Sequence, residues 1–306
     1  MRIGAHMSIA GGMDLAVDRA QALGCEALQV FVKSSNQWAA RPLKEDEVAR
    51  FRDKVGRAGL QPVVAHDSYL VNVGSCDPAL WRKSLDALDV ELSRCEVLGI
   101  PYLVMHPGAH CGAGEDAAFA AIARALNELH AKHRGASVTI LLENTAGQGT
   151  VVGHRFEQLK AIIDRVRRPE RLGVCFDTQH AFAAGYDLAT EAGWQATWDE
   201  FDRVLGRDRL LALHLNDSKK PLGSRVDRHE HIGLGLLGAA TFVRLVNDAR
   251  FEGLPASIET EKTDDGFEDA QNLAVLRALR GRKRAPSPAT IARWRGEALR
   301  RARAAR

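Results

Sequence analysis

Eight short apolar runs, spaced along the first 260 residues, constrain the fold of this 306-residue chain more than any other feature. Segments whose apolar residues recur at helical spacing, such as 43–59 and 116–133, lie between them. Apolar strands that alternate with helices are typical of a parallel sheet covered on its outer side. The runs are RIGAH (2–6), ALQVFV (27–32), PVVAH (62–66), YLVMHP (102–107), TILLEN (139–144), LGVCFDT (172–178), LLALHLND (210–217) and ASIET (256–260).

Eight strand-and-helix units predict an α/β fold, a closed (β/α)₈ TIM barrel, because such a barrel typically needs about 250 residues. We expect residues 1–280 to form one catalytic TIM-barrel domain and residues 281–306 to form a basic C-terminal tail. An open, doubly wound sheet is the alternative, since the number of strands does not by itself close a sheet.

The composition excludes several classes of protein. The chain is 45% hydrophobic with mixed charge, which fits a folded protein with a full core. No apolar run approaches the roughly 18 residues of a membrane span, and the opening MRIGAHMSIAGG lacks the layout of a signal peptide. Five cysteines without a C-x-x-C pair indicate neither a disulfide framework nor a thiolate zinc site. We therefore expect a cytoplasmic protein without a membrane partner.

Charge is distributed unevenly along the chain. Ten Lys/Arg and one Glu lie between Arg280 and Arg306, which leaves 32 basic and 38 acidic residues elsewhere, a net charge of −6. A terminal basic block is typical of an arm that binds a polyanion, but a solvated extension has the same composition. The segment 289–306 could also form a helix with Ile291, Trp294 and Ala298 on one side, docked on the barrel. All three alternatives stay open.

Six consecutive apolar runs, the third to the eighth, carry a histidine or a carboxylate at or near their carboxyl ends. In a barrel these ends surround one mouth. One such histidine alone is more typical of a structural hydrogen bond, but six buried polar groups together need a compensating cation. Three further candidates lie in the following loops. The nine residues are His66, His106, Glu143, Asp177, His214 and Glu259 at the strand ends, and His180, Asp227 and His229 beyond them.

This set of side chains predicts a metal centre. Imidazole and carboxylate ligands without cysteine suit zinc, manganese or iron. Nine ligands are too many for one ion and fit two or three.

The stretch SRVDRHEHIGLGLLG (224–238) has two competing interpretations. Gly233-x-Gly235-x-x-Gly238 matches a dinucleotide-binding turn, whereas Asp227 and His229 suit a metal. A dinucleotide turn should follow a strand and precede an acidic residue by roughly 20 positions, and neither condition holds. We therefore predict no nucleotide cofactor, and expect the glycines to let the loop return Asp227 and His229 over the mouth.

The sequence resembles the endonuclease IV family of zinc-dependent DNA repair endonucleases that act at abasic sites. The resemblance covers roughly the first 280 residues, from RIGAHMSIAGG to the eighth run. It is carried, in order, by AHDSYLVN, MHPGAH, LENTAGQG, FDTQHAFAAGYD, HLNDSK and DRHEHIG.

The resemblance implies three divalent metal ions, most simply Zn²⁺, with Mn²⁺ an option at one or more sites. Spacing alone assigned no residue to a particular ion and did not choose between His229 and His231; the family pattern favours His229. The implied ligand sets are His66, His106 and Glu143 for the first ion, Glu143 as a bridge with Asp177, His214 and Glu259 for the second, and His180, Asp227 and His229 for the third.

The resemblance also implies the reaction, with Glu143 and Glu259 as catalytic residues. In base excision repair, metal-bound hydroxide would hydrolyse the phosphodiester 5′ to an abasic site in duplex DNA. The products would be a 3′-hydroxyl and a 5′-deoxyribose phosphate. We expect the protein to act as a monomer on this DNA.

Three loop residues are implied to contact DNA. Tyr69 and Leu70 match the side chains with which the family penetrates the duplex beside a flipped-out abasic nucleotide. Asn36 stands where the family often has arginine, and it lacks the charge and length of that residue. The alternative for Tyr69 and Leu70 is a loop that packs on its own barrel.

Two other functions compete with a nuclease. A sugar isomerase or epimerase of the related barrel type needs one or two metals, which would leave His180, Asp227 and His229 without a role. A non-catalytic DNA-binding protein would not need nine metal-binding side chains at the strand ends.

Overall fold

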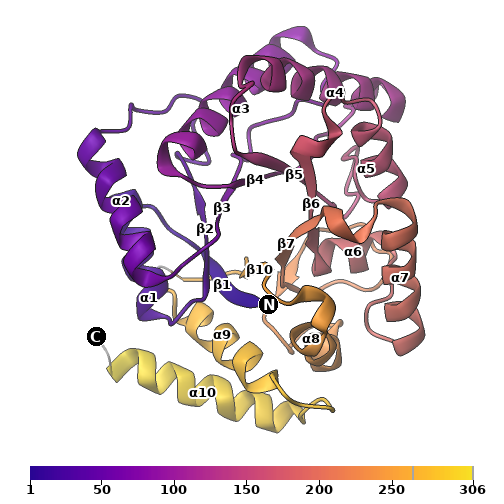
Figure 1. Cartoon of the computed structure of the whole chain (residues 1–306). Helices are drawn as coiled ribbons and strands as arrows, with labels where there is room; N and C mark the ends of the chain where they lie inside the picture. Colours follow the sequence, from indigo (N-terminus) through magenta and orange to yellow (C-terminus); the bar gives the residue numbers. More distant parts are fainter. Residues whose placement is uncertain (264, 305–306) are drawn as a thin grey trace.

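A computed structural model, which describes residues 1–263 and 265–304, shows a closed barrel of eight parallel strands surrounded by helices (Figure 1). The predicted TIM barrel is confirmed. The strands follow one another around the barrel in the order β1-β10-β7-β6-β5-β4-β3-β2. Their bounds are β1 Arg2–Met7, β2 Ala27–Phe31, β3 Val63–His66, β4 Tyr102–Met105, β5 Thr139–Glu143, β6 Leu172–Asp177, β7 Leu210–His214 and β10 Pro255–Ile258.

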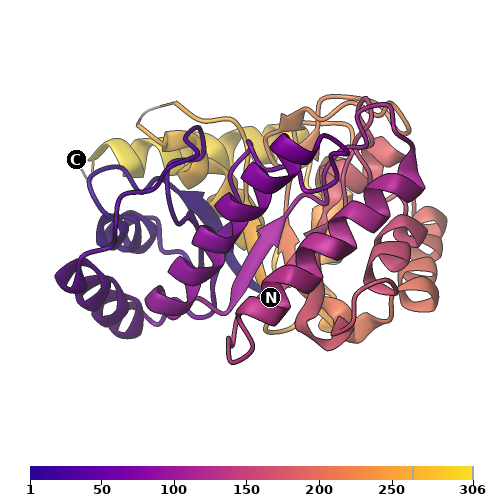
Figure 2. The same cartoon turned by 90° about the horizontal axis from the view of Figure 1, so that it is seen from above.

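The helices form a layer around the outside of the barrel, as the view from above also shows (Figure 2). Apolar residues on the inner faces of these helices are buried, for example Phe51 and Val55 of α2. The α-helices are α1 Met13–Ala22, α2 Glu45–Ala58, α3 Pro78–Leu98, α4 Glu115–Lys132, α5 Phe156–Ile163, α6 Thr178–Ala184, α7 Glu191–Val204, α8 Gly238–Asn247, α9 Phe267–Leu279 and α10 Pro288–Ala304, with short 3₁₀ helices at Pro169–Arg171, Arg207–Arg209 and Ala249–Phe251. None of the described helices is long and apolar enough to cross a membrane.

A small apolar cluster, separate from the core beneath the helices, is formed by one residue from each of five consecutive barrel strands. Each of its members precedes a predicted metal ligand by two positions. Because side chains two apart in a strand point the same way, the ligands form the next layer above this cluster. The cluster is Val64, Val104, Leu141, Cys175 and Ala212, below His66, His106, Glu143, Asp177 and His214.

The run predicted as one strand over 210–217 divides into two elements. The barrel strand β7 ends at His214, and Asp217–Ser218 form β8, which pairs antiparallel with β9, His229–Glu230. The separation arises because Asp217 turns away to bind backbone amides of the glycine-rich loop. Through this two-stranded ribbon the loop returns to the mouth, as the sequence predicted.

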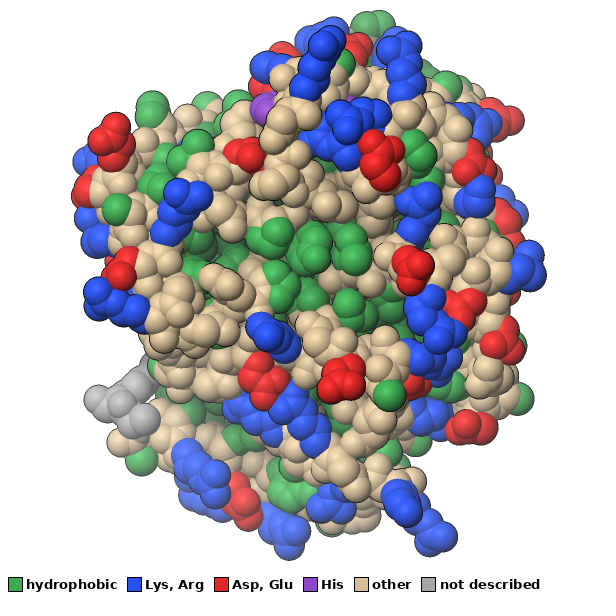
Figure 3. All heavy atoms as spheres, viewed as in Figure 1, with side chains coloured by type: hydrophobic (Ala, Val, Ile, Leu, Met, Phe, Trp, Pro, Cys, Tyr) green, Lys and Arg blue, Asp and Glu red, His purple; other side chains and the backbone are tan. Residues whose placement is uncertain are grey.

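The C-terminal segment forms a helix, α10, that packs against α9 at one side of the barrel (Figure 1). Ile291 and Arg295 are buried in this contact. Of the alternatives for the segment, the structure therefore shows the docked helix. Its arginines at 293, 300, 301 and 303 remain exposed, and Figure 3 shows Lys and Arg side chains along that edge of the molecule.

Candidate metal centre

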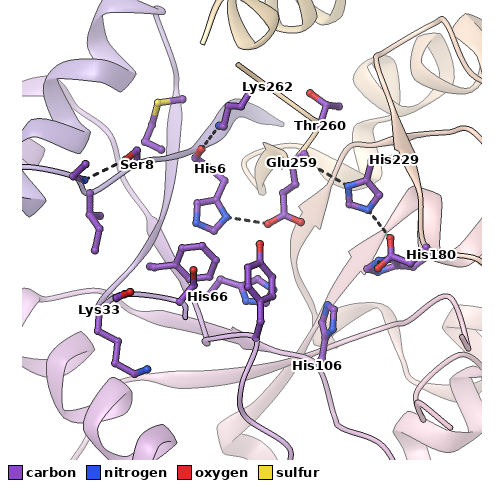
Figure 4. Close-up of a pocket in the computed structure, with 18 residues that line it drawn as sticks. His6, Ser8, Lys33, His66, His106, His180, His229, Glu259, Thr260 and Lys262 are labelled. Carbon is purple, nitrogen blue, oxygen red and sulfur yellow. Dashed lines mark hydrogen bonds and ion pairs between the residues drawn. The ribbon is translucent and has the colours of Figure 1, made fainter. Parts of the chain in front are cut away.

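The nine predicted ligands converge at the carboxyl ends of the strands. Six of them line a cavity of about 700 Å³ (Figure 4), namely His66, His106, His180, Asp227, His229 and Glu259. The other three, Glu143, Asp177 and His214, are fully buried and complete the ligand groups. Four of the nine are the last residues of β3, β5, β6 and β7. His106 and Glu259 come one residue after β4 and β10. His180 lies in α6, Asp227 in the loop before β9, and His229 in β9.

The first group surrounds one oxygen of Glu143. Nε2 of His66 lies 3.1 Å and Nε2 of His106 lies 3.2 Å from Glu143 Oε2. Glu143 is fully buried, and His106 is the most exposed of the three. Two imidazole nitrogens and one carboxylate oxygen thus meet at one point.

The second group forms around Nδ1 of His214, on the other oxygen of Glu143. This nitrogen lies 2.9 Å from Glu143 Oε1, 3.1 Å from Glu259 Oε2 and 3.8 Å from Asp177 Oδ2. Parallel pairing of β6 with β7 places Asp177 directly beside His214. Glu143 therefore belongs to both groups, with one oxygen in each.

The third group joins α6 to the loop before β9. Asp177 ends β6 and caps α6 by accepting the backbone N–H of His180 at 2.8 Å, which places His180 one turn along the helix. His180 Nε2 lies 3.2 Å from Asp227 Oδ2, and His229 Nε2 lies 3.4 Å from Asp227 Oδ1. His229 Nε2 is also 4.0 Å from Asp177 Oδ2. The compact third group is therefore Asp177, His180 and His229, so Asp177 belongs to both the second and the third groups. The predicted ligand Asp227 meets the two histidines of this group through different oxygens.

Four of the five histidines use one ring nitrogen in a contact at the edge of the site and direct the other towards the carboxylates. His66 Nδ1 lies 2.9 Å from the carbonyl oxygen of Asp67, His180 Nδ1 lies 3.0 Å from that of Asn144, and His229 Nδ1 lies 3.0 Å from that of Glu259. His214 uses Nε2, which lies 2.8 Å from Gln29 Oε1. Such outer contacts fix the tautomer and orientation of histidines that bind metals.

The charges of the ligand groups complement one another. Burial raises the pKa of Glu143, but the imidazoles of His214 and His106 outweigh it and hold that pKa well below its usual range. Burial lowers the pKa of His214, whereas Cys175 and the carboxylates Glu259 and Glu143 raise it well above its usual range. Imidazoles and buried carboxylates therefore compensate one another electrostatically, and a divalent cation would compensate the same carboxylates.

The residues fit divalent cations. Four tetrahedral ligands at ~2.0–2.1 Å from zinc are about 3.3 Å apart, close to most of the separations between these nitrogen and oxygen atoms. His229 Nε2 is buried and has no hydrogen-bond partner among the described residues. Such an atom, aimed at two carboxylates in the third group, suits a metal bond.

His231 lies outside the site, which distinguishes it from His229. Its Nδ1 lies 3.1 Å from Asn272 Nδ2, between the loop and α9. Residues two apart in the short ribbon would share a side, but the chain leaves the ribbon after Glu230.

The glycine-rich turn binds an internal carboxylate. The amides of Gly233 and Gly235 donate to Asp217 Oδ2 at 3.0 and 3.1 Å, and that of Leu237 donates to Oδ1 at 2.9 Å. A Cβ on Gly235 would lie 2.5 Å from Asp217 Oδ1, so the close approach requires glycine. The amides that would hold a pyrophosphate in a dinucleotide turn are thus occupied by Asp217.

The three predicted DNA-contact residues differ in position. Tyr69 is 71% exposed at the rim of the cavity, with its ring edge-on to Phe31 at 5.4 Å between centroids. Leu70 is half-buried beside it. Asn36 is exposed in the loop after β2 and does not line the cavity.

Residues of the first two strands also reach the site, and the sequence analysis missed them. His6 of β1 lies 3.0 Å from Glu259 Oε1, and Gln29 of β2 donates to the same oxygen at 2.5 Å. His6 ends the first predicted run, so the signal that identified His66 could have identified it. Asn216, which donates to Asp177 Oδ2 at 2.6 Å, carried no such signal.

The family model of xylose isomerase-like TIM barrels matches residues 17–279. A probable endonuclease 4 of Chloroflexus aurantiacus is 50% identical over 278 residues, 91% of this chain and 98% of that protein. One of Geobacter is 50% identical over 277 residues, 90% of this chain and 98% of that protein. The crystal structure of endonuclease IV from Thermus thermophilus is 39% identical, covers 91% of this chain and 98% of its own, and has a TM-score of 0.79.

A D-tagatose 3-epimerase-like protein has a TM-score of 0.70 at 15% identity, a likeness that shows a shared barrel alone. The endonuclease relatives, in contrast, combine high identity with matches over almost their full length. The chain therefore belongs to the endonuclease IV family.

Proposed function

We propose that this protein is a metal-dependent endonuclease of base excision repair that hydrolyses the phosphodiester 5′ to an abasic site in duplex DNA. The products are a 3′-hydroxyl and a 5′-deoxyribose phosphate. The observation that best supports the proposal is the presence of three ligand groups at one mouth, with Glu143 shared by two of them. Family membership supports the choice of DNA as substrate.

The chain would hold one divalent ion in each group, zinc or manganese by its ligand chemistry. When bound, such ions lower the pKa of water and neutralise the charge that develops on a departing oxygen. The chain's part is to fix the ligands. Glu143 keeps its two oxygens apart in two groups, and Gln29 and the Glu259 carbonyl orient His214 and His229. We propose Glu143 and Glu259 as the catalytic carboxylates on this basis.

Recognition of the abasic nucleotide is proposed for the rim of the cavity. An exposed tyrosine can stack in the space that a missing base leaves, and Leu70 beside it can wedge the neighbouring pair apart. Asn36 offers an exposed amide from the loop after β2, the strand that pairs with β3. The rim also carries the exposed Lys262, which suits an anionic backbone.

An epimerase is the competing function, because related barrels share the architecture. The test uses purified protein loaded with zinc or manganese on two substrates, a duplex with one abasic-site analogue and a ketohexose. We expect cleavage of the duplex and no epimerisation. Epimerisation of the sugar with an intact duplex would overturn the proposal.

A further inference from the structure

Arg295 of α10 is an unusual buried charge. Only 8% of the residue is exposed, and no carboxylate of a described residue lies within ion-pair distance of its guanidinium. Nη1 donates to Asn272 Oδ1 at 2.7 Å, and Nη2 donates to Gln271 Oε1 at 3.4 Å, both on α9. A buried guanidinium is costly unless it is hydrogen-bonded, so these two amides carry its compensation.

Asn272 connects the two loops that bear metal ligands. Its Nδ2 donates to Thr260 Oγ1 at 2.7 Å, and its Oδ1 accepts the backbone N–H of Ile232 at 3.1 Å. Thr260 directly follows Glu259, and Ile232 lies three residues after His229. One side chain therefore ties the segment after β10 to the loop around β9.

Two donors, Arg295 Nη1 and the Ile232 N–H, fix the orientation of that amide. An asparagine amide has one acceptor and one donor end, and a 180° flip exchanges them. A guanidinium is only a donor, so it must face Oδ1. This leaves Oδ1 towards Ile232 N–H and Nδ2 towards Thr260, whereas the flipped amide would place a donor against the Ile232 N–H.

A second contact joins α10 to the same loop. Gly233 has φ +78°, and a Cβ built on it would lie 2.9 Å from Cδ1 of Ile291. Ile291 is 2% exposed and packs in the core below the loop. The helix thus supports the loop with an apolar contact and a hydrogen-bonded one.

We propose that α10 is a brace that fixes the loop of residues 227–233, and that Arg295 is a positioning residue for His229. The family model ends at residue 279, before α10 begins at Pro288, so the brace adds an element that the matched region lacks. This inference rests on the proposed third ion, because the loop holds Asp227 and His229 in the positions from which they would bind that ion.

The experiment compares Arg295→Met with Arg293→Met, an exposed arginine on the same helix, in the full-length protein. Hydrogen exchange of residues 227–233 is measured first in chelator-stripped protein, where no ion can order the loop. Loss of a hydrogen bond to a charged group should speed exchange about tenfold or more in Arg295→Met and leave Arg293→Met as in the wild type. Zinc competition should then show weaker binding of one ion, about tenfold.

Two further variants separate bracing from general loss of folding. Ile291→Val removes only Cδ1, the atom nearest Gly233, and should loosen the loop without lowering protection in the barrel strands. Arg295→Lys keeps a donor and should restore part of the protection. Unchanged exchange at 227–233 in Arg295→Met, or an equal rise in Arg293→Met, would overturn the brace. A wild-type protein that binds fewer than three ions would instead contradict the third site, with the exchange result still deciding the brace.

Discussion

Replacing His229 or His231 with alanine compares two histidines of one loop that the structure assigns to different roles. His229 Nε2 lies 3.4 Å from Asp227 Oδ1 and has no hydrogen-bond partner among the described residues, whereas His231 Nδ1 contacts Asn272. His229→Ala should therefore lose one metal ion per chain, and His231→Ala should retain it.

The expected magnitudes differ widely. Four ligands bind a structural zinc ion with about 10–16 kcal/mol, or roughly 2.5–4 kcal/mol for each ligand, so His229→Ala should weaken one site by about a hundredfold or more. His231→Ala removes at most one neutral hydrogen bond, about 1 kcal/mol, which corresponds to roughly fivefold.

The assay has two measurements. Plasma mass spectrometry gives the metal content after dialysis, and competition with a chromophoric chelator gives the affinity for zinc. Circular dichroism serves as the control that both variants fold. If His231→Ala lost the ion and His229→Ala kept it, the assignment of the third group would be wrong.

The remaining predictions concern the shared carboxylate, the rim and the basic helix. Glu143→Gln should lower cleavage by roughly two orders of magnitude or more in a folded barrel, because an amide cannot offer a charged oxygen to two groups; near-normal turnover at full metal content would exclude the bridge. Tyr69→Ala should weaken binding to an abasic duplex by about 1–3 kcal/mol and to an intact duplex much less, and equal losses in a binding titration would indicate a structural tyrosine. Changing Arg293, Arg300 and Arg301 to Gln, which spares Arg295, should make the slope of log affinity against log salt shallower by about two, and an unchanged slope would exclude α10 as a DNA contact.

The barrel and its ligand layer could be predicted because they depend on the two-residue alternation of side chains along each strand. Alternation in each strand places Leu141 and Glu143, or Ala212 and His214, on the same inner side, so the sequence carries both the lining and the ligands. His6 was within reach of the same reasoning. The loop pair Asp227 and His229 needed the family pattern, since spacing alone allowed His231.

Other features depend on contacts between distant segments. Asp217 was assigned to the end of a strand, but it turns away because five backbone amides, from Ser218 to Gly238, converge on its carboxylate. The buried position of Arg295 depends on Asn272, which lies on another helix. A basic, arginine-rich segment is typical of a solvated arm, so composition did not indicate that one of its arginines packs inside.

Cleavage of a duplex with a single abasic-site analogue, with the ends of both fragments identified by mass spectrometry, tests the proposed activity most directly. Protein loaded with zinc or manganese should leave a 3′-hydroxyl and a 5′-deoxyribose phosphate, and the chelator-stripped protein should leave the strand intact until metal is restored. Cleavage on the 3′ side of the abasic site, or equal cleavage with and without chelator, would contradict a metal-dependent hydrolysis at this centre.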